Sequence, residues 1–330
     1  MKVLFNTYST AFFVPGGGEV QLLKTREHLQ RLGVEVDLYN PWDPAVEQYD
    51  VVHMFSARGG SWPFHDAVRE RGVPLVLSPI LWLQHGGGQF PIHDIYHLFH
   101  RSDLVLPNSE AELDGFDFFY NLPREHFRVV YNGIDPRLAE GPGADLFLKT
   151  YPHRDFLLCV ANVEPRKNQL ALIHACQGLN RPLLLVGGVR EQDYLDKCLE
   201  AGRGFVHYLG RFEAESDLLK SAYQACAAHV LASHFETPGL ASMEAAVLGA
   251  RVVSTDVGCA REYFGDLAHY VRPNDVPGIR SAIEAALSDP RNAAALRLRM
   301  LENFTWRHTA QQTLAAYEEV LARKGRTAKS

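Results

Sequence analysis

Residues 234–249 read HFETPGLASMEAAVLG, and this stretch decides the fold of the second half of the chain. It follows an apolar, strand-like run that ends at Ser233, and a helical pattern begins near Gly239. A strand, a loop and a helix in this order are the unit of a parallel α/β sheet. Pro238 and Gly239 bring backbone N–H groups close to a ligand, and the helix dipole adds positive charge that suits a diphosphate.

Strand–helix alternation extends from this stretch over the whole chain and falls into two series. Two such series predict two doubly wound, Rossmann-like α/β domains. The strands expected in the first series are residues 3–6, 34–39, 51–55, 75–78, 104–107 and 129–131. Those expected in the second are residues 156–161, 183–186, 206–209, 230–232, 252–254 and 270–271.

The expected boundary between the domains lies in residues 135–154, which contain Gly141-Pro142-Gly143 and Pro152. Glycine and proline in such a cluster are typical of a linker. We therefore expect an N-terminal domain at residues 1–150 and a C-terminal domain at residues 151–308. A last helix, at about residues 309–323, could pack back on the first domain.

Composition excludes several classes of protein. No apolar run approaches the roughly 18 residues that span a bilayer, and the N-terminus enters a strand-like run rather than a secretory leader. We expect a cytoplasmic protein without a transmembrane segment, and peripheral membrane contact stays open. The net charge is −6, and residues 1–120 hold 8 Lys/Arg against 15 Asp/Glu, which argues against a nucleic-acid partner. Five cysteines without a C-x-x-C pair are expected to be free thiols.

Two further segments have the character of anion-binding loops. Residues 159–168, CVANVEPRKN, end a strand and open a helix, where the cations Arg166 and Lys167 are unfavourable unless an anion such as a phosphate binds beside them. Residues 15–19, PGGGE, follow the first strand, and their glycines allow a ligand to approach the backbone.

These segments together resemble the retaining GT-B glycosyltransferases of family 4, the group 1 glycosyltransferases. The family pattern E-x-[FP]-G-L-x-x-x-E-A fits residues 236–245, and residues 249–258, GARVVSTDVG, match the stretch that follows it. Residues 159–168 look like the family's R-K-N segment, and residues 15–19 resemble its G-G-x-E loop. The resemblance covers nearly the whole chain and is most specific after residue 155.

The resemblance implies a GT-B fold, with two Rossmann-like domains facing an interdomain cleft. A nucleotide-sugar donor would lie on the second domain, and a glycan or lipid-linked acceptor on the first. Glu236 would contact the transferred sugar as a catalytic residue, and Glu244 would bind the ribose. The donor-binding residues implied are Gly17, Arg166, Lys167, Phe212, Gly239, Leu240 and Glu244.

Two positions depart from the family pattern. The family usually has a histidine just after the fourth strand of the first domain, where this chain has Ile80. His85, five residues later, would take over the catalytic role if its loop folds back. Many members also carry an arginine where this chain has Asn162, and Arg166 is a candidate replacement.

The spacing of the histidines at 93, 97 and 100 puts them on one helix face, an arrangement that could hold a metal ion. They lack the carboxylate or thiolate that completes the usual zinc set, so structural or surface roles are favoured. The chain also lacks a D-x-D pair, which metal-dependent sugar-nucleotide enzymes commonly use. We expect neither a cofactor nor a metal.

The function expected from these features is metal-independent transfer of a sugar to an acceptor hydroxyl, with retention of configuration, as in polysaccharide biosynthesis. Two alternatives stay open. The chain could be a non-catalytic GT-B scaffold that binds a sugar nucleotide, which Asn162 and the missing histidine favour. It could also be a sugar-nucleotide epimerase, which shares the two-lobed fold, although the Glu236–Glu244 segment opposes that interpretation.

Overall fold

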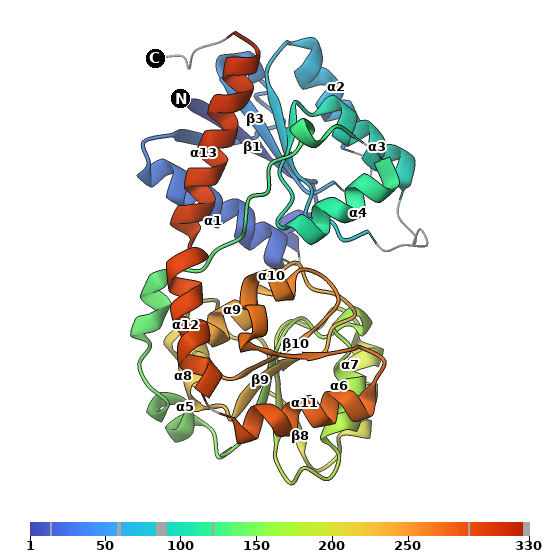
Figure 1. Ribbon diagram of the computed structural model, residues 1–330, viewed down its shortest axis with the longest axis vertical. Coiled ribbons are helices and arrows are strands. Elements are labelled where there is room, and N and C mark those ends of the chain that lie inside the picture. The colour runs from blue at the N-terminus through green and yellow to red at the C-terminus, as the bar shows by residue number, and fades with distance from the viewer. Residues whose placement is uncertain (14, 58–60, 84–90, 121, 290, 326–330) are drawn as a thin grey trace. The chain divides into compact units, whose positions relative to one another are not determined.

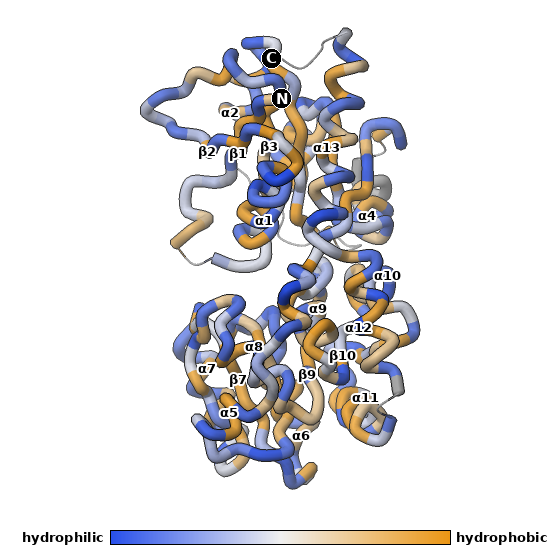
Figure 2. Tube along the Cα trace, turned by 90° about the vertical axis from the view of Figure 1, so that its left-hand side faces the viewer, coloured by the Kyte–Doolittle hydropathy of each residue, from blue (hydrophilic) through white to orange (hydrophobic). Residues whose placement is uncertain are grey.

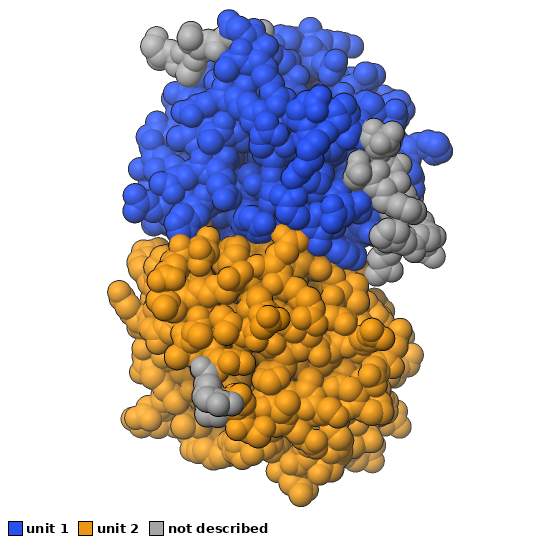
Figure 3. All heavy atoms as spheres, viewed as in Figure 1, with its two compact units in different colours: residues 1–133, 306–330 blue, residues 134–305 orange. Residues whose placement is uncertain are grey.

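The computed structural model describes residues 1–13, 15–57, 61–83, 91–120, 122–289 and 291–325. The chain divides into two compact units, shown in different colours in Figure 3. Unit 1 consists of Met1–Gly133 with Trp306–Ser330, and unit 2 of Ile134–Thr305. No described helix is long and apolar enough to cross a membrane.

Unit 1 is built on a five-stranded parallel sheet with the strand order β2-β1-β3-β4-β5. This is the flavodoxin-like order, in which the chain reverses its winding direction between β1 and β3. Core strands such as β3 are buried along their whole length, because helices cover the sheet on both faces. The strands are β1 (Lys2–Asn6), β2 (Glu35–Leu38), β3 (Val51–Phe55), β4 (Leu75–Ser78) and β5 (Leu104–Val105).

The C-terminal helix of the chain belongs to unit 1, where α13 packs along α1 (Figure 1). Its Tyr317 is buried with Oη 2.6 Å from Nδ1 of His53 on β3, and Nε2 of His53 lies 2.9 Å from Ser78 Oγ. The helices of unit 1 are α1 (Gly17–Arg31), α2 (Trp62–Glu70), α3 (Ile92–Arg101), α4 (Glu110–Tyr120) and α13 (Trp306–Arg323). Short 3₁₀ turns are η1 (Ala11–Phe13), η2 (Val46–Gln48) and η3 (Arg124–His126).

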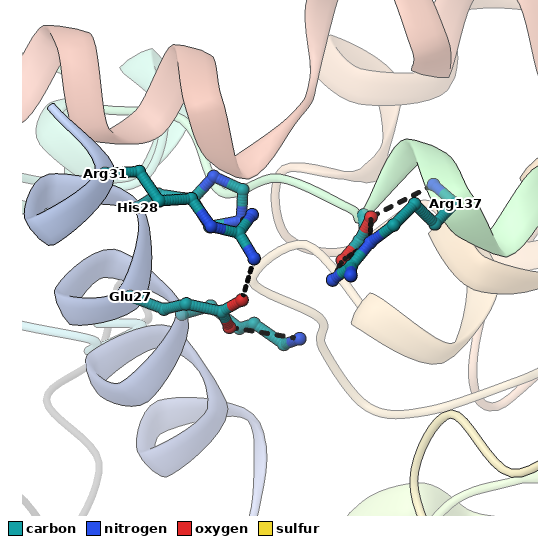
Figure 4. A network of polar contacts seen from close by, with 6 residues as sticks. Glu27, His28, Arg31 and Arg137 are labelled. Atoms are coloured by element: carbon teal, nitrogen blue, oxygen red, sulfur yellow. Dashed lines mark hydrogen bonds and ion pairs between the residues drawn. The ribbon is translucent and has the colours of Figure 1, made fainter.

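Charged side chains line part of α1, as the close-up in Figure 4 shows. Arg31 donates to Glu27 one turn earlier and lies 3.4 Å from the ring of His28. In unit 2, Arg137 forms a bidentate pair with Asp135, two residues before it. The exposed pair of Arg31 and Glu27 contributes at most about 1 kcal/mol, whereas Asp135 is buried beside its arginine.

Unit 2 contains a six-stranded parallel sheet with the order β11-β10-β9-β6-β7-β8. Numbered from its first strand, this is the 3-2-1-4-5-6 order of the dinucleotide-binding Rossmann sheet. Figure 2 shows hydrophobic residues along the strands of both units. The strands are β6 (Leu157–Val160), β7 (Leu183–Val186), β8 (Val206–Tyr208), β9 (Ala228–Leu231), β10 (Val252–Thr255) and β11 (His269–Val271).

Helices connect these strands and cover the sheet, and the core between them holds three of the chain's cysteines, Cys159, Cys176 and Cys198. All five cysteines are free, as predicted. The helices are α5 (Asp145–Thr150), α6 (Gln169–Cys176), α7 (Gln192–Ala201), α8 (Asp217–Ala225), α9 (Leu240–Val247), α10 (Ala260–Phe264), α11 (Val276–Ser288) and α12 (Arg291–Asn303). The 3₁₀ turns are η4 (Pro136–Glu140), η5 (Pro165–Lys167) and η6 (Gly265–Leu267).

One expected strand, at residues 129–131, is wrong. This segment runs beside the end of β5 through the bonds Arg128 N to Val105 O and Val130 N to Pro107 O. Tyr131 then turns to α13, where its N–H donates to Gln312 and its carbonyl accepts from Thr309. Pro107 has no N–H with which to return the next bond of a parallel ladder to Arg128 O, so the pairing ends before it becomes a strand.

The units divide at residues 133/134 and 305/306, whereas the sequence placed the first boundary at 150/151. The intervening residues pack on α8 in unit 2. Phe147 is fully buried against Phe156 and its N–H donates to Ser221, while Gly143 N donates to Gln224. These contacts are the physical reason for the different position.

Candidate functional site

The strand order of unit 2 brings two loops together at the carboxyl edge of its sheet. Strands β6 and β9 are neighbours, but β6 leads on to β7 on one side and β9 to β10 on the other. The winding therefore reverses between them, and in parallel α/β sheets ligands bind in the crevice at such a point. The loops that leave here are residues 161–168 after β6 and residues 232–239 after β9.

An ion pair joins these two loops. Lys167 Nζ donates to Glu236 Oε1 at 2.6 Å, with 13% of the lysine side chain and 5% of the glutamate side chain exposed. Burial alone would raise the pKa of Glu236, but the charges of Lys167 and Arg166 outweigh it, so this pKa lies below its ordinary value. Burial lowers the pKa of Lys167, and the negative charge of Glu236 opposes that effect.

The backbone of Glu236 is held in place by the segment after β10. Glu236 N donates to Val257 O, and Glu236 O accepts from Cys259 N. Gly258 lies between these bonds with φ of 109°, and a Cβ there would come within 2.1 Å of the Glu236 carbonyl oxygen. Residue 258 must therefore be glycine for Glu236 to keep its position.

Asn168 fixes the other loop to the ends of two strands. Its side-chain amide donates to Ala232 O, just after β9, and to Pro273 O, just after β11. His234 N donates to Arg166 O, which adds a direct bond between the two loops. The site is thus built on backbone bonds and a buried amide, so Lys167 and Glu236 are held rigidly.

Further arginines stand at the same edge of the sheet. Arg166 and Arg190, from the loops after β6 and β7, share the carboxylate of Glu164 at 2.9 and 3.3 Å. Arg166 also lies over the ring of Phe235, 5.2 Å from its centre. Nothing in the sequence spacing links Arg190 to Glu164, because the two residues lie on different loops.

Arg211 and Asn162, the position that departs from the family pattern, both approach Gly188. A Cβ at Gly188 would lie 3.3 Å from Asn162 Oδ1 and 4.0 Å from Arg211 Cδ. The next residue, Phe212, stacks on Tyr151 with ring centres 6.0 Å apart. The loop after β8 thus brings a cation and an aromatic ring to the carboxyl edge.

Helix α9 begins where the sequence predicted. Gly239 is its N-cap with φ of 88°, and no side chain caps this end, so the first backbone N–H groups of the helix, from Leu240 onward, suit an anion. Glu244 follows in the second turn and accepts a hydrogen bond from Tyr223 Oη on α8 at 3.2 Å.

In unit 1, Gly17 is the first residue of α1, at the carboxyl end of β1. Glu19 already supplies a carboxylate to this helix end, accepting from Gly16 N at 2.6 Å and from Tyr8 Oη at 3.0 Å. Ile80 has φ of 49° and its side chain faces Gly18. His85 lies outside the described residues.

Two polar motifs of unit 1 form a buried network. The side chains of Gln21, on α1, and Asn108 exchange two hydrogen bonds. The side-chain oxygen Oε1 of Gln21 also accepts from the side-chain amide of Asn132. The carboxylate of Glu112 accepts hydrogen bonds from the backbone N–H groups of Asn108 and Leu81. The segments around Asn108 and Asn132 therefore join α1 to the strand ends.

His93, His97 and His100 are exposed on α3. Among the residues that the structure describes, no group of three or more His, Cys, Asp or Glu side chains could hold a metal.

Taken together, the carboxyl edge of unit 2 offers a buried ammonium, an ionised carboxylate, an uncapped helix N-terminus and additional arginines. Cations and helix N–H groups in a site with little water stabilise negative charge on a bound or departing phosphate. The carboxylate of Glu236 beside them can stabilise positive charge on an adjacent carbon centre.

Comparisons with known proteins show the family to which the chain is similar. Residues 154–289 match the family model described as "Glycosyl transferases group 1", and residues 45–138 match the model "Glycosyltransferase Family 4". Glycogen synthase of Mycobacterium tuberculosis is 31% identical over 237 residues, which are 67% of this chain and 55% of that protein. O-antigen chain mannosyltransferase B of Escherichia coli is 34% identical over 175 residues, which are 49% of this chain and 45% of that protein. The chain thus spans about half the length of these curated relatives.

Solved structures match over nearly the whole chain. Anabaena Alr3699/HepE in complex with UDP-glucose has a TM-score of 0.81 at 20% identity, covering 97% of this chain and 100% of that one. Sucrose-phosphate synthase of Thermosynechococcus elongatus has a TM-score of 0.79 at 18% identity, covering 98% and 100%. These similarities show the GT-B fold. With that fold and both family models matched, the chain belongs to the group 1, or family 4, glycosyltransferases.

Proposed function

We propose that this protein transfers a hexose from a nucleotide-sugar donor to a hydroxyl of a glycan or lipid-linked acceptor, with retention of configuration. The donor binds to unit 2 and the acceptor to unit 1. The observation that carries the proposal is the buried pair of Lys167 and Glu236 at the point where the unit 2 sheet reverses its winding. Ionised groups are costly to bury, so a pair at a ligand-binding edge is better explained by chemistry than by stability.

The diphosphate of the donor lies against Lys167 and the N-terminus of α9 in this proposal. As the bond from the sugar to the phosphate breaks, negative charge grows on the departing nucleoside diphosphate, and these fixed groups stabilise it. Arg211, which like Asn162 approaches Gly188, supplies the cation that many family members have at position 162. Phe212 on the same loop offers an aromatic face to the base.

The sugar carbon gains oxocarbenium-like character as the same bond breaks. Glu236 is held ionised by Lys167 and Arg166, so its carboxylate lies ready to stabilise that positive charge. The acceptor hydroxyl oxygen then bonds to the sugar carbon on the face that the diphosphate left. Its proton passes to an oxygen of the departing phosphate, which balances the reaction without a metal ion.

The relatives support a hexosyl donor. Anabaena Alr3699/HepE has been solved with UDP-glucose, and the curated relatives include a glycogen synthase and mannosyltransferases. These relatives differ in acceptor, so the acceptor proposed here is a class, namely glycans and lipid-linked glycans. Because this chain spans about half of those relatives, the scaffold and epimerase alternatives are retained as outcomes of the experiment.

In the test, purified protein is incubated with UDP-, ADP- and GDP-linked hexoses and a panel of oligosaccharide acceptors, and the reaction is followed by proton NMR. The reaction is run separately with manganese, with magnesium and with EDTA. We expect release of nucleoside diphosphate and a product that keeps the donor's anomeric configuration, with turnover surviving EDTA. Conversion of the donor to an epimer without release of nucleoside diphosphate would indicate an epimerase. Binding without turnover in every condition would indicate a scaffold. Turnover lost in EDTA and restored by metal would refute the metal-independent mechanism.

A further inference from the structure

A buried phenol stands behind one of the two glutamates of the site. Tyr223 Oη donates to Glu244 Oε2 at 3.2 Å, and the tyrosine is 1% exposed. The two residues lie on neighbouring helices, α8 and α9, on either side of β9 in the chain. Tyr223 is thus hidden from any ligand while touching a carboxylate at the ligand-binding edge.

The ring of Tyr223 is held in place from several sides. It meets the ring of His229, on β9, edge to face with centres 5.5 Å apart, and His229 Nδ1 lies 3.4 Å from Ser242 Oγ on α9. Helix α8 is fixed in turn by residues 143 and 147, whose backbone N–H groups donate to Gln224 and Ser221. Packing of the ring in this way keeps the phenol oxygen beside Glu244 Oε2.

Tyr223 remains a donor over the working range of pH. Burial, reinforced by the nearby charge of Glu244, raises the pKa of Tyr223 well above its ordinary value. A carboxylate has about four lone-pair sites on its two oxygens, so Glu244 can accept this hydrogen and still accept two hydroxyls of a ligand.

We propose that Tyr223 is a positioning residue that orients the carboxylate of Glu244 toward a vicinal diol, such as the ribose of a nucleoside diphosphate. This rests on the proposed function and on the ribose contact of Glu244 that the family resemblance implies. Tyr223 does not touch the ligand. It removes rotational freedom from Glu244, so the diol meets a carboxylate that already points at it, and less entropy is lost on binding.

The competing explanation is that Tyr223 only fills the core between α8 and β9. The two explanations differ in what removal of the hydroxyl does. A core role changes the stability of unit 2 and leaves recognition of the ribose intact. A positioning role weakens ribose recognition through Glu244 and leaves the diphosphate contacts of Lys167 unchanged.

The experiment measures dissociation constants by calorimetry for UDP, ADP and GDP, and then for the 2′-deoxy form of the nucleotide that binds most tightly. It compares wild type, Tyr223→Phe, Glu244→Gln and the double variant. Tyr317→Phe is the matched control, because it removes a fully buried, hydrogen-bonded phenol from unit 1. We expect Tyr223→Phe to bind about tenfold more weakly, to lose much of the preference for ribose over 2′-deoxyribose, and to raise the donor KM with little change in kcat. Tyr317→Phe is expected to bind as wild type does.

The double variant decides between the two explanations. If Tyr223 acts through Glu244, adding Tyr223→Phe to Glu244→Gln weakens binding no further. The positioning role alone would be overturned if Tyr223→Phe weakened nucleotide binding equally in the wild type and in Glu244→Gln. It would also be overturned if Tyr223→Phe kept the affinity and the ribose preference of the wild type. Absence of nucleotide binding by the wild type would overturn the proposed function together with this inference.

Discussion

Lys167 Nζ lies 2.6 Å from Glu236 Oε1 and so joins the loop after β6 to the loop after β9. The two residues are 69 positions apart in the chain, and both side chains are largely buried. An anion that binds Lys167 therefore meets a carboxylate beside it. The pair can separate the two charges that develop when a sugar leaves a phosphate, with the cation on one side and the anion on the other.

Removing one charge of this pair should cost more stability than removing both. Lys167→Met leaves Glu236 buried without its ammonium partner, which is expected to lower the free energy of unfolding by about 3–5 kcal/mol. The double variant Lys167→Met/Glu236→Gln leaves no such charge and should recover most of that loss. Urea unfolding measures both. Equal losses in the single and double variants would mean that the two side chains do not interact.

Gly258 and Gly249 form a matched pair for testing how Glu236 is held. Both have positive φ, but a Cβ at Gly249 meets nothing within 4 Å, whereas one at Gly258 meets the Glu236 carbonyl oxygen at 2.1 Å. Gly249→Ala should cost about 1–2 kcal/mol of stability, from backbone strain alone, and keep activity. Gly258→Ala should cost more and should lower kcat, because Glu236 must shift. Urea unfolding and steady-state kinetics check both variants, and similar behaviour of the two would contradict the clamp on Glu236.

The sheets could be predicted from the sequence because their strands are short apolar runs, buried on both faces and separated by helices. All six expected strands of unit 2 and five of the six of unit 1 are present, within a few residues. The segment at 129–131 has the same apolar, β-branched character. It is not a strand because Pro107 has no N–H to return a ladder bond to it, and Tyr131 bonds on its other side to α13, almost 180 residues later in the chain.

The two glutamates of the site should differ in their kinetic effects. Glu236 lies where charge develops, so Glu236→Gln should lower kcat by about 10- to 1000-fold with a smaller change in donor affinity. Glu244 is expected to bind ribose equally well in the ground state and the transition state, so Glu244→Gln should mainly raise the donor KM. Steady-state kinetics on both variants, with circular dichroism to verify folding, gives the comparison. A Glu236→Gln variant with wild-type kcat would remove Glu236 from the chemistry.

Buried neutral histidines should make the protein lose stability in mild acid. Burial lowers the pKa of His53 to about 3, that of His65 to about 4 and that of His229 to about 3. Below the unfolded value of 6.5 the unfolded chain takes up protons that the folded chain does not, so stability falls as the pH drops. Each of these histidines then lowers the free energy of unfolding by about 2 kcal/mol as the pH falls from 6.5 to 5.

His53→Gln tests this pH dependence. Its free energy of unfolding should fall by about 2 kcal/mol less than that of the wild type over the same pH range, because one proton-linked site is gone. The comparison uses urea unfolding at several pH values, and His174→Gln, at an exposed position on α6, is the control. An unchanged pH dependence in His53→Gln would mean that His53 is protonated in the folded protein.

The site was less predictable than the fold. The sequence placed Lys167 and Glu236 on loops after strands, but their contact depends on β6 and β9 being neighbours, and the strand order cannot be derived from hydrophobic spacing. For the same reason the carboxylate of Glu164, shared by Arg166 and Arg190, went unrecognised. Tyr223 occupies a position on α8 that spacing cannot distinguish from any other core residue. Contacts between loops and between helices are set by packing, which local sequence does not encode.

The central claim is that unit 2 binds a nucleoside diphosphate through Lys167, and calorimetric titration of UDP, ADP and GDP tests it most directly. Wild type is compared with Lys167→Met/Glu236→Gln, in which no buried charge of the pair remains, and with Lys197→Met, at an exposed position on α7. The account predicts that at least one nucleotide binds to the wild type and to Lys197→Met alike. It also predicts that the double variant binds that nucleotide about 10- to 100-fold more weakly, as loss of a charged hydrogen bond implies. Equal affinity in all three proteins, or binding of no nucleotide to the wild type, would contradict it.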